Sequence, residues 1–264
     1  MVNITFWGVR GSTPCPCDAN RRYGGNTSCV TVEAPGLDPI LFDLGTGLRF
    51  YGDVVDPTEL FRGLALVTHL HWDHIQGLPF FTPLFIPGSR LAFHGPKTEL
   101  GLREVLRLQM SDPVFPVRLD DLASQLSFTE LSDGASVTLP GDVTVTAARL
   151  NHPGGVLAYR VSHGGRSVVY ATDTEHYSCP DPKLVRLCQG ADMLIYDAMY
   201  DDDEYAGRRG APRTGWGHST FTEGVRVADA AGVLVTVAVG CGVGDGSPGR
   251  SVAVTVGVNV VVGV

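Results

Sequence analysis

One short run of the chain contains three imidazoles and a carboxylate, and it directly follows an apolar stretch. The run is Thr68-His69-Leu70-His71-Trp72-Asp73-His74, and the apolar residues Leu64–Val67 before it predict a buried strand. Neutral imidazoles and carboxylates are the ligands that zinc and similar divalent metals prefer. Histidine makes up only 8 of the 264 residues, so chance is a poor explanation for three in one run. The run therefore predicts a metal site at the end of a strand.

The spacing within the run suits two metal ions. His69 and His71 lie two positions apart in a predicted extended turn, so both side chains can face one metal. Asp73 and His74 follow at a predicted helix start, where they can face a second metal close by.

Two further donors are predicted at the ends of later strands. His152 lies in the turn Asn151–Gly155, after the predicted strand Val143–Leu150, and Asp173 ends the apolar strand Ser167–Ala171. Taken alone, each residue type is more often a structural polar group in a turn. Together with the histidine run they are typical of a dinuclear pocket built from strand ends, where the two oxygens of Asp173 can bridge the metals.

Short apolar or alternating segments predict strands along most of the chain, with helices between some of them. Strands are predicted at residues 2–7, Ser28–Glu33, Ile40–Asp43, Leu64–Thr68, Leu126–Glu130, Ser136–Leu139, Val143–Leu150, Val156–Ser162, Ser167–Ala171 and Met193–Tyr196, and helices at 97–111, 182–190 and 220–231. This pattern predicts an α/β (α+β) fold with two mixed sheets packed together and helices outside. Neither a linker nor a repeat is visible, so one domain over residues 1–264 is expected.

Net charge and hydropathy argue against several classes of partner and location. The net charge of −8 and the pI near 5.4 argue against a broad nucleic-acid footprint, and leave only a local patch at Arg208, Arg209 and Arg213.

Asp201–Glu204 is expected to be a solvated loop, with a lid as the alternative. Residues 1–10 lack a signal-peptide pattern and no stretch before residue 251 is long and apolar enough to span a membrane, so a cytoplasmic protein without a membrane partner is expected.

The six cysteines are scattered, which favours reduced thiols over a disulfide framework. Cys15 and Cys17 could supply half of a structural zinc site, but no second pair of thiols lies nearby in the sequence. Reduced thiols in a loop are therefore the favoured interpretation.

The motifs in combination resemble the metallo-β-lactamase superfamily, and within it the ribonuclease Z–like and cyclic-nucleotide phosphodiesterase–like branch. Besides the His-x-His-x-Asp-His run, the resemblance depends on the later His and Asp and on Gly8–Ser12, Arg22–Ser28, Asp43–Gly47, Asn151–Pro153, Thr172–His176 and Gly217–Thr220. It covers roughly residues 2–232. It implies a four-layer αββα sandwich of two mixed sheets, with the metals at one edge.

The resemblance also implies a ligand set for two divalent ions, with zinc as the first choice and manganese or iron as alternatives. His69, His71 and His152 would hold one ion and Asp73 and His74 the other. Asp173 would bridge the two.

The implied chemistry is metal-dependent hydrolysis, which needs no nucleophilic Ser or Cys because the metals activate water and clamp the phosphoryl oxygens. In the ribonuclease Z–like branch, a Glu pairs with the His of Gly-His-Ser-Thr to relay protons. Asp197 and His218 occupy those places here, and Asp73 would orient or deprotonate the attacking water. The structural alternative for His218 is a residue at a helix start, with Ser219 or Thr220 as its cap.

The expected substrate is a small phosphodiester such as a cyclic nucleotide. Ribonuclease Z–like enzymes that process tRNA typically carry a flexible basic arm, whereas only twenty residues separate His152 from Asp173, with Arg160, His163 and Arg166 as their positive or titratable groups. Nucleic acid is accordingly not the expected partner. The alternatives are tRNA 3′ processing, hydrolysis of a lactone, thioester or β-lactam, and a degenerate metal-binding protein. Similar proteins commonly form homodimers, so a second copy of this chain is the candidate protein partner.

Residues 232–264 depart from the family pattern. Relatives end a further strand with a histidine that completes the second metal site, but His218 is the last histidine of this sequence. From Val233 the chain is rich in Val and Gly, with only Asp245 and Arg250 charged, as an altered reading frame could produce. We expect residues 233–239 to supply the strand, a second metal site without its last ligand, and weakened activity.

Overall fold

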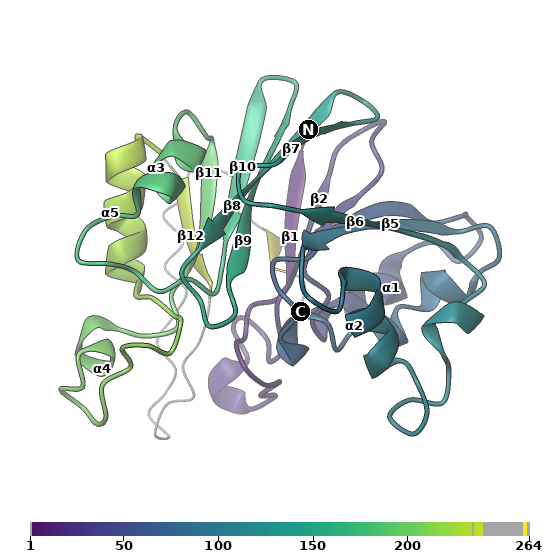
Figure 1. Ribbon diagram of the computed structural model, residues 1–264, viewed down its shortest axis with the longest axis horizontal. Coiled ribbons are helices and arrows are strands. Elements are labelled where there is room, and N and C mark those ends of the chain that lie inside the picture. The colour runs from purple at the N-terminus through teal and green to yellow at the C-terminus, as the bar shows by residue number, and fades with distance from the viewer. Residues whose placement is uncertain (1, 234, 240–260, 263–264) are drawn as a thin grey trace. The chain divides into compact units, whose positions relative to one another are not determined.

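The computed structural model describes residues 2–233, 235–239 and 261–262 (Figure 1). The chain divides into two compact units. Unit 1 consists of Met1–Leu131 with Val260–Val264, and unit 2 of Ser132–Asn259. The single domain expected over residues 1–264 stays a prediction.

Unit 1 is built on a mixed sheet of seven described strands in the order β13-β1-β2-β3-β4-β5-β6. These are β1 (Asn3–Gly8), β2 (Cys29–Glu33), β3 (Ile40–Phe42), β4 (Arg62–Leu66), β5 (Arg90–Pro96), β6 (Gln125–Leu131) and β13 (Val261–Val262). Strand β2 pairs antiparallel with β1 and with β3, β13 pairs parallel with β1, and β3 through β6 are parallel neighbours. Its longer helices are α1 (Gly47–Val54) and α2 (Leu102–Gln109), and short 3-10 helices cover Asp18–Asn20, Trp72–His74, Leu78–Phe80, Thr82–Phe85 and Leu119–Asp121.

The parallel part of this sheet decides where the histidine run lies. Phe42 of β3 is in register with Leu66 of β4, so both strands end at the same edge. Asp43 and Thr68, which follow those ends closely, are therefore brought together. The predicted metal motif thus begins beside a carboxylate that is distant in sequence.

The core of unit 1 lies between the sheet and its two helices, and it corrects one predicted helix. Leu102, Leu106 and Met110 are buried, as expected for one face of a helix over 97–111. Leu100 was expected on the same face, but it is 63% exposed. The helix begins only at Leu102, because Gly101 adopts a positive φ of 84° and turns the chain into it.

Unit 2 is built on a mixed sheet of six described strands in the order β12-β11-β10-β9-β8-β7. These are β7 (Ser136–Leu139), β8 (Val143–Leu150), β9 (Val156–His163), β10 (Arg166–Ala171), β11 (Met193–Asp197) and β12 (Val235–Val239). Strands β7 to β10 pair antiparallel, while β10, β11 and β12 are parallel. The helices are α3 (Pro182–Cys188), α4 (Asp202–Tyr205) and α5 (Phe221–Ala231).

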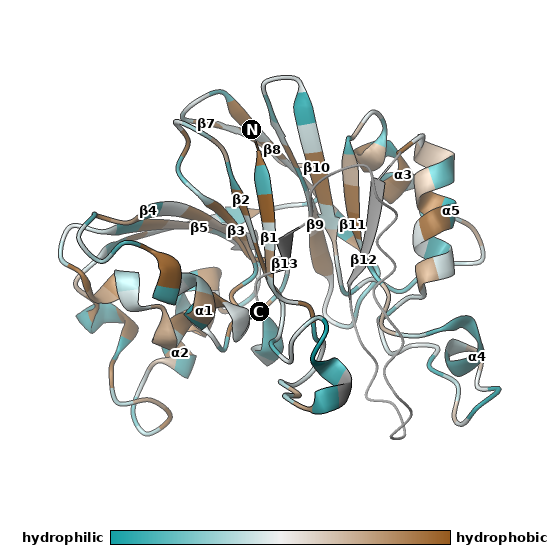
Figure 2. Cartoon of the chain, turned by 180° about the vertical axis from the view of Figure 1, so that it is seen from behind, coloured by the Kyte–Doolittle hydropathy of each residue, from teal (hydrophilic) through white to brown (hydrophobic). Residues whose placement is uncertain are grey.

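Helices α3 and α5 lie side by side against this sheet (Figure 1). Figure 2 shows apolar residues along β10 and β11 and on part of α5. Leu184 and Leu187 of α3 and Val227 of α5 pack with Val169 and Leu194 of the strands in one buried cluster. Burial of this apolar face stabilises the edge of the sheet where β10 and β11 end.

The C-terminal prediction is confirmed in part. Residues 235–239 form β12, which pairs with β11 as the strand expected at 233–239. Residues 240–260 and 263–264, which contain most of the atypical segment, lie outside the described residues. Among the described helices, none is long and apolar enough to cross a membrane.

Candidate metal-binding and catalytic groups

A buried carboxylate at the end of β3 orients the histidine run of unit 1. Asp43 Oδ1 accepts hydrogen bonds from Thr68 N at 2.8 Å and Thr68 Oγ1 at 2.9 Å, and Asp43 Oδ2 lies 2.8 Å from His74 Nδ1. Thr68 Oγ1 also lies 3.1 Å from His69 Nδ1. Because the Thr68 hydroxyl donates its proton to Asp43, its oxygen accepts from His69. Both His69 and His74 therefore carry their proton on Nδ1, which makes Nε2 the nitrogen with the lone pair for a metal.

The four predicted ligands of the run are brought together within unit 1. The ring centroid of His69 lies 4.4 Å from that of His71 and 4.3 Å from that of His74. Asp73 Oδ2 lies 3.5 Å from His74 Nε2 and accepts a hydrogen bond from Ser12 N at 2.7 Å. Close approach of a carboxylate to the lone-pair nitrogen of an imidazole is the donor arrangement that a divalent cation requires.

In unit 2, His152 is oriented in the same way. Its Nδ1 lies 2.7 Å from the carbonyl oxygen of Gly217, to which it must donate, so its lone pair also lies on Nε2. His152 is buried in the turn after β8, where the sequence predicts it.

Asp173, Asp197 and His218 form a second cluster in unit 2. Their ligand-type atoms all lie within 4.8 Å of one another. Ala171 of β10 is in register with Tyr196 of β11, so the residues that follow the two strands meet at one edge. Asp173 adopts a positive φ of 53°, a strained conformation for a non-glycine residue.

The pairing of Asp197 with His218 is direct. Asp197 Oδ2 lies 2.9 Å from His218 Nδ1, and the backbone amides of Thr174 and Met199 donate to its two oxygens at 3.1 and 2.9 Å. The carboxylate is buried and is fixed by these two amides. It therefore holds the His218 ring with Nε2 on the side away from Asp197. Thr220 is the N-cap of α5, but its side chain makes no capping hydrogen bond. The structure thus brings the two predicted residues together, while their catalytic role stays a prediction.

Sequence reasoning assigned no role to Asp43 or to Glu175. Glu175 Oε1 accepts from Gly215 N at 2.7 Å and Tyr205 Oη at 2.8 Å, and its Oε2 accepts from Gly217 N at 2.9 Å. Burial alone would raise the pKa of Glu175, but these hydrogen bonds outweigh it and hold the pKa below its usual value. Glu175 therefore ties the loop that precedes His218 to the strand end that bears Asp173. Only its position two residues after Asp173 could have suggested it.

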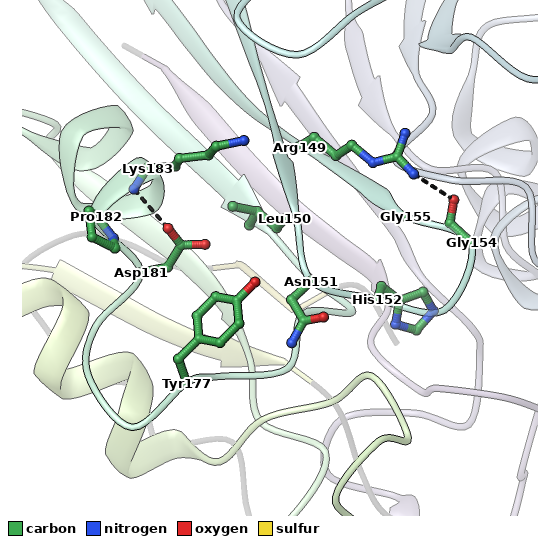
Figure 3. A pocket seen from close by; sticks show the side chains of 10 residues that line it. All are labelled: Arg149, Leu150, Asn151, His152, Gly154, Gly155, Tyr177, Asp181, Pro182 and Lys183. Atoms are coloured by element: carbon green, nitrogen blue, oxygen red, sulfur yellow. Dashed lines mark hydrogen bonds between the residues drawn. The ribbon is translucent and has the colours of Figure 1, made fainter.

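A pocket of about 610 Å³ opens beside His152 within unit 2. Figure 3 shows Tyr177 and Lys183 on one side of it and Arg149 on the other, with His152 at one end. Arg149 Nη2 donates to the Gly154 carbonyl at 3.1 Å. A Cβ at position 155 would overlap the guanidinium, so Gly155, with a φ of 87°, is the residue that permits this arrangement.

The expected basic patch is paired with the acidic run that precedes it. Arg208 pairs with Asp203 at 2.6 Å, Arg209 pairs with Asp201, and Arg213 Nη2 lies 3.7 Å from Glu204. The solvated loop expected at residues 201–204 is a short helix instead, because Asp201 caps α4 by accepting from the amides of residues 203 and 204. Asp202 and Asp203 are exposed, as expected.

The described cysteines form no disulfide with one another, and their reduced state stays a prediction. The free ones are Cys15, Cys17, Cys29, Cys179 and Cys188. Cys15 and Cys17 are exposed, and their sulfur atoms lie 4.0 Å apart.

The comparison with protein families decides the superfamily. A family model for the β-lactamase superfamily domain matches residues 40–240. The chain belongs to this superfamily. Ribonuclease Z of Natronomonas pharaonis is 27% identical over 289 residues, which cover 87% of this chain and 83% of the relative.

Solved structures of the superfamily agree with the fold. The metallo-β-lactamase fold protein YhfI of Bacillus subtilis has a TM-score of 0.68 at 19% identity, covering 90% of this chain and 85% of that one. The short form of human tRNase Z has a TM-score of 0.64 at 23% identity, covering 90% and 92%. The predicted fold class, two mixed sheets with helices in a metallo-β-lactamase fold, is confirmed. The chain is a hydrolase of this superfamily, and its clustered His and Asp side chains are of the kind that bind divalent metals.

Proposed function

We propose that the protein is a metal-dependent phosphodiesterase that cleaves RNA, with a tRNA precursor as the first candidate substrate. The observation that carries this proposal is the pairing of the buried Asp197 with the partly buried His218, 2.9 Å apart beside Asp173. The ribonuclease Z relatives support it, because they match most of both chains. They favour RNA over the small phosphodiester expected from charge and loop length.

The metal ligands proposed are those that the family resemblance implies. His69, His71 and His152 would bind one ion, Asp73 and His74 the other, and Asp173 both. The hydrogen bonds of His69, His74 and His152 fit this proposal, since each ring has its proton on Nδ1. Divalent cations bound there would polarise the phosphodiester and make water nucleophilic near neutral pH.

His218, supported by Asp197, would then donate a proton to the leaving oxygen. Nε2 of His218 faces away from Asp197, so it is the atom that can donate a proton to that oxygen. Asp197 stabilises the protonated ring and holds its orientation through the two backbone amides that fix the carboxylate. General acid catalysis of this kind contributes about 10²- to 10⁴-fold to a rate.

A small phosphodiester is the second candidate, and one specific observation favours it. Residues 153–172, all of them described, form little more than the hairpin of β9 and β10, closed at Gly164 and Gly165, and carry no inserted arm. The pocket beside His152 has a volume within the range of small-ligand sites. Hydrolysis of a lactone, thioester or β-lactam has less support, because the Asp197–His218 pair suits phosphate chemistry.

The test is hydrolysis by the zinc-loaded protein of four substrates. These are a tRNA precursor with a 3′ trailer, a 3′,5′-cyclic nucleotide, bis-p-nitrophenyl phosphate and a chromogenic β-lactam. We expect cleavage of the RNA at the trailer and of bis-p-nitrophenyl phosphate, but not of the lactam. Cleavage of the cyclic nucleotide without the RNA would select the second candidate. A fully metallated protein that cleaves none of the three phosphodiesters would overturn the proposal.

Matched variants test the proton relay. His218→Ala and Asp197→Asn should each lower the rate constant by about 10²- to 10⁴-fold while the metal content is unchanged. His163→Ala is the control, because this histidine lies at the end of the β9 strand in the same unit. Loss of metal in His218→Ala would show instead that His218 is a ligand.

A further inference from the structure

Three side chains form a row that leads from His218 to the surface of unit 2. The ring of Tyr200 lies edge-on to that of His218, with 6.0 Å between centroids. The guanidinium carbon of Arg213 lies 5.7 Å from the Tyr200 centroid and 4.7 Å from the Trp216 centroid. Arg213 is thus sandwiched between two aromatic faces, in the geometry of cation–π contacts.

Trp216 is the outer member of this row, and it is 55% exposed. An exposed indole normally loses freedom when a ligand binds, but this one is held in advance. Its backbone N donates to Arg213 O at 3.1 Å, and the flanking amides of Gly215 and Gly217 both donate to Glu175. Little conformational entropy is therefore lost when a ligand binds to the ring, and this favours affinity.

The charges around the row favour stacking over phosphate binding. Arg208 and Arg209 are paired with Asp203 and Asp201, and Arg213 faces Glu204. Nε of Arg213 is buried without a hydrogen-bond partner among the described residues, and the guanidinium lies against the rings of Tyr200 and Trp216. The surface therefore offers an aromatic face rather than a set of unpaired cations.

Unpaired nucleobases are the ligands that such a face suits, because single-stranded RNA is bound largely by stacking on aromatic side chains and guanidinium planes. We infer that Trp216 stacks a nucleobase of single-stranded RNA next to the bond that His218 acts on. Arg213 and Tyr200 are positioning residues that support the indole from behind. This inference rests on the proposed function for the identity of the ligand, but not for its test.

The test is direct binding of a ten-nucleotide oligoadenylate, followed by tryptophan fluorescence. Stacking should quench part of the emission of the unmodified protein, and Trp216→Phe should remove the share that Trp216 contributes, so that only the signal of Trp7 and the exposed Trp72 remains. Trp216→Ala should weaken binding by about 5- to 100-fold, the range expected for loss of one stacked base, whereas Trp216→Phe should retain most of it. Phe221→Ala is the matched control, since Phe221 is also an exposed aromatic residue of unit 2.

Two further measurements separate this inference from its rivals. The metal content and the urea unfolding curve of Trp216→Ala should match those of the unmodified protein, so that a loss of binding reports the indole and not a damaged site. Binding should fall only gently with salt, because few phosphates are neutralised, and heparin should compete poorly.

The experiments give different results if the stacking inference fails and if the proposed function fails. Quenching by oligoadenylate in a protein that hydrolyses no phosphodiester would leave the stacking site standing and remove the proposed function. The stacking site would be overturned if Trp216→Ala bound oligoadenylate as tightly as the unmodified protein does. It would also be overturned if heparin displaced labelled oligoadenylate as well as unlabelled oligoadenylate does. Both outcomes count whatever the protein hydrolyses.

Discussion

Asp43 Oδ2 lies 2.8 Å from Nδ1 of His74, and both side chains are completely buried. The carboxylate ends one parallel strand, and the imidazole ends the motif that follows the next strand. Through Thr68 the same carboxylate also orients His69. One buried acid thus decides the tautomer of two candidate metal ligands at once.

Asp43→Asn should weaken metal binding while leaving the size of the side chain unchanged. An amide cannot accept from Thr68 and His74 together without turning one N–H toward a donor, so at least one ring loses its orientation. Loss of such a supporting group typically lowers metal affinity by about 10- to 100-fold. Competition for zinc against a chromophoric chelator measures it, with Asp56→Asn, an exposed aspartate bonded to Thr58, as the control. Equal zinc affinity in Asp43→Asn and the unmodified protein would refute the role assigned to Asp43.

Two glycines separated by one residue allow a matched test of the His152 position. Gly215 and Gly217 both have a φ of 84°, so alanine strains the backbone equally, by about 1–2 kcal/mol. A Cβ at 217 would overlap His152 Nδ1 and Pro153 Cδ, whereas a Cβ at 215 meets nothing within 4 Å. We expect Gly217→Ala to lose about 1–3 kcal/mol more stability than Gly215→Ala, and to lose metal as well. Urea unfolding and elemental analysis of the two variants check this, and indistinguishable variants would contradict it.

Glu175 should make stability depend on pH. Its folded-state pKa is held below the usual value by the hydrogen bonds from Gly215, Tyr205 and Gly217, which outweigh the opposing effect of burial. A carboxylate with a lowered folded pKa contributes stability above its unfolded pKa and loses it as pH falls through the folded value. Glu175→Gln should therefore cost about 2 kcal/mol at pH 7, and the difference should shrink below about pH 4. Urea titrations at several pH values test this; a difference that stays constant with pH would argue against it.

Metal content tests the proposed ligand set. Elemental analysis should find about two ions per chain in the unmodified protein if groups other than a C-terminal histidine complete the second site. His69→Ala should lose much of this metal, because the proposed ligand Asp173 would be shared by both ions. Chelation should abolish hydrolysis but leave the far-UV circular dichroism nearly unchanged, since the buried apolar clusters of both units contain no ligand. One ion or fewer per unmodified chain would support instead the expectation of a second site that lacks its last histidine.

Several elements could be predicted because their signal is local. Every strand predicted from alternation or an apolar run is present, with its ends within two residues of the prediction. Besides α4, β13 and the short 3-10 helices, one long strand and one longer helix were missed. β5 contains Arg90, His94, Gly95 and Pro96, and its composition obscures a strand that is held by pairing with β4 and β6. α1 has glycines within and at its start, which lower helix propensity, and burial of Leu48 and Tyr51 compensates.

The sequence by itself determined the fold class and the set of candidate ligands. His69, His71, Asp73 and His74 are close in space because they are close in the chain, so a pattern within six residues was enough to find them. Only the tertiary structure decided which nitrogen of each ring holds the proton, because that depends on Asp43 for His69 and His74 and on Gly217 for His152. Each histidine and the group that orients it are separated by up to 65 residues in the chain. They come into contact only when parallel strands end at the same edge of a sheet, or when a buried carboxylate binds the backbone of a distant loop. A hydrogen bond depends on positions in space, and sequence spacing carries no record of them once the chain has turned.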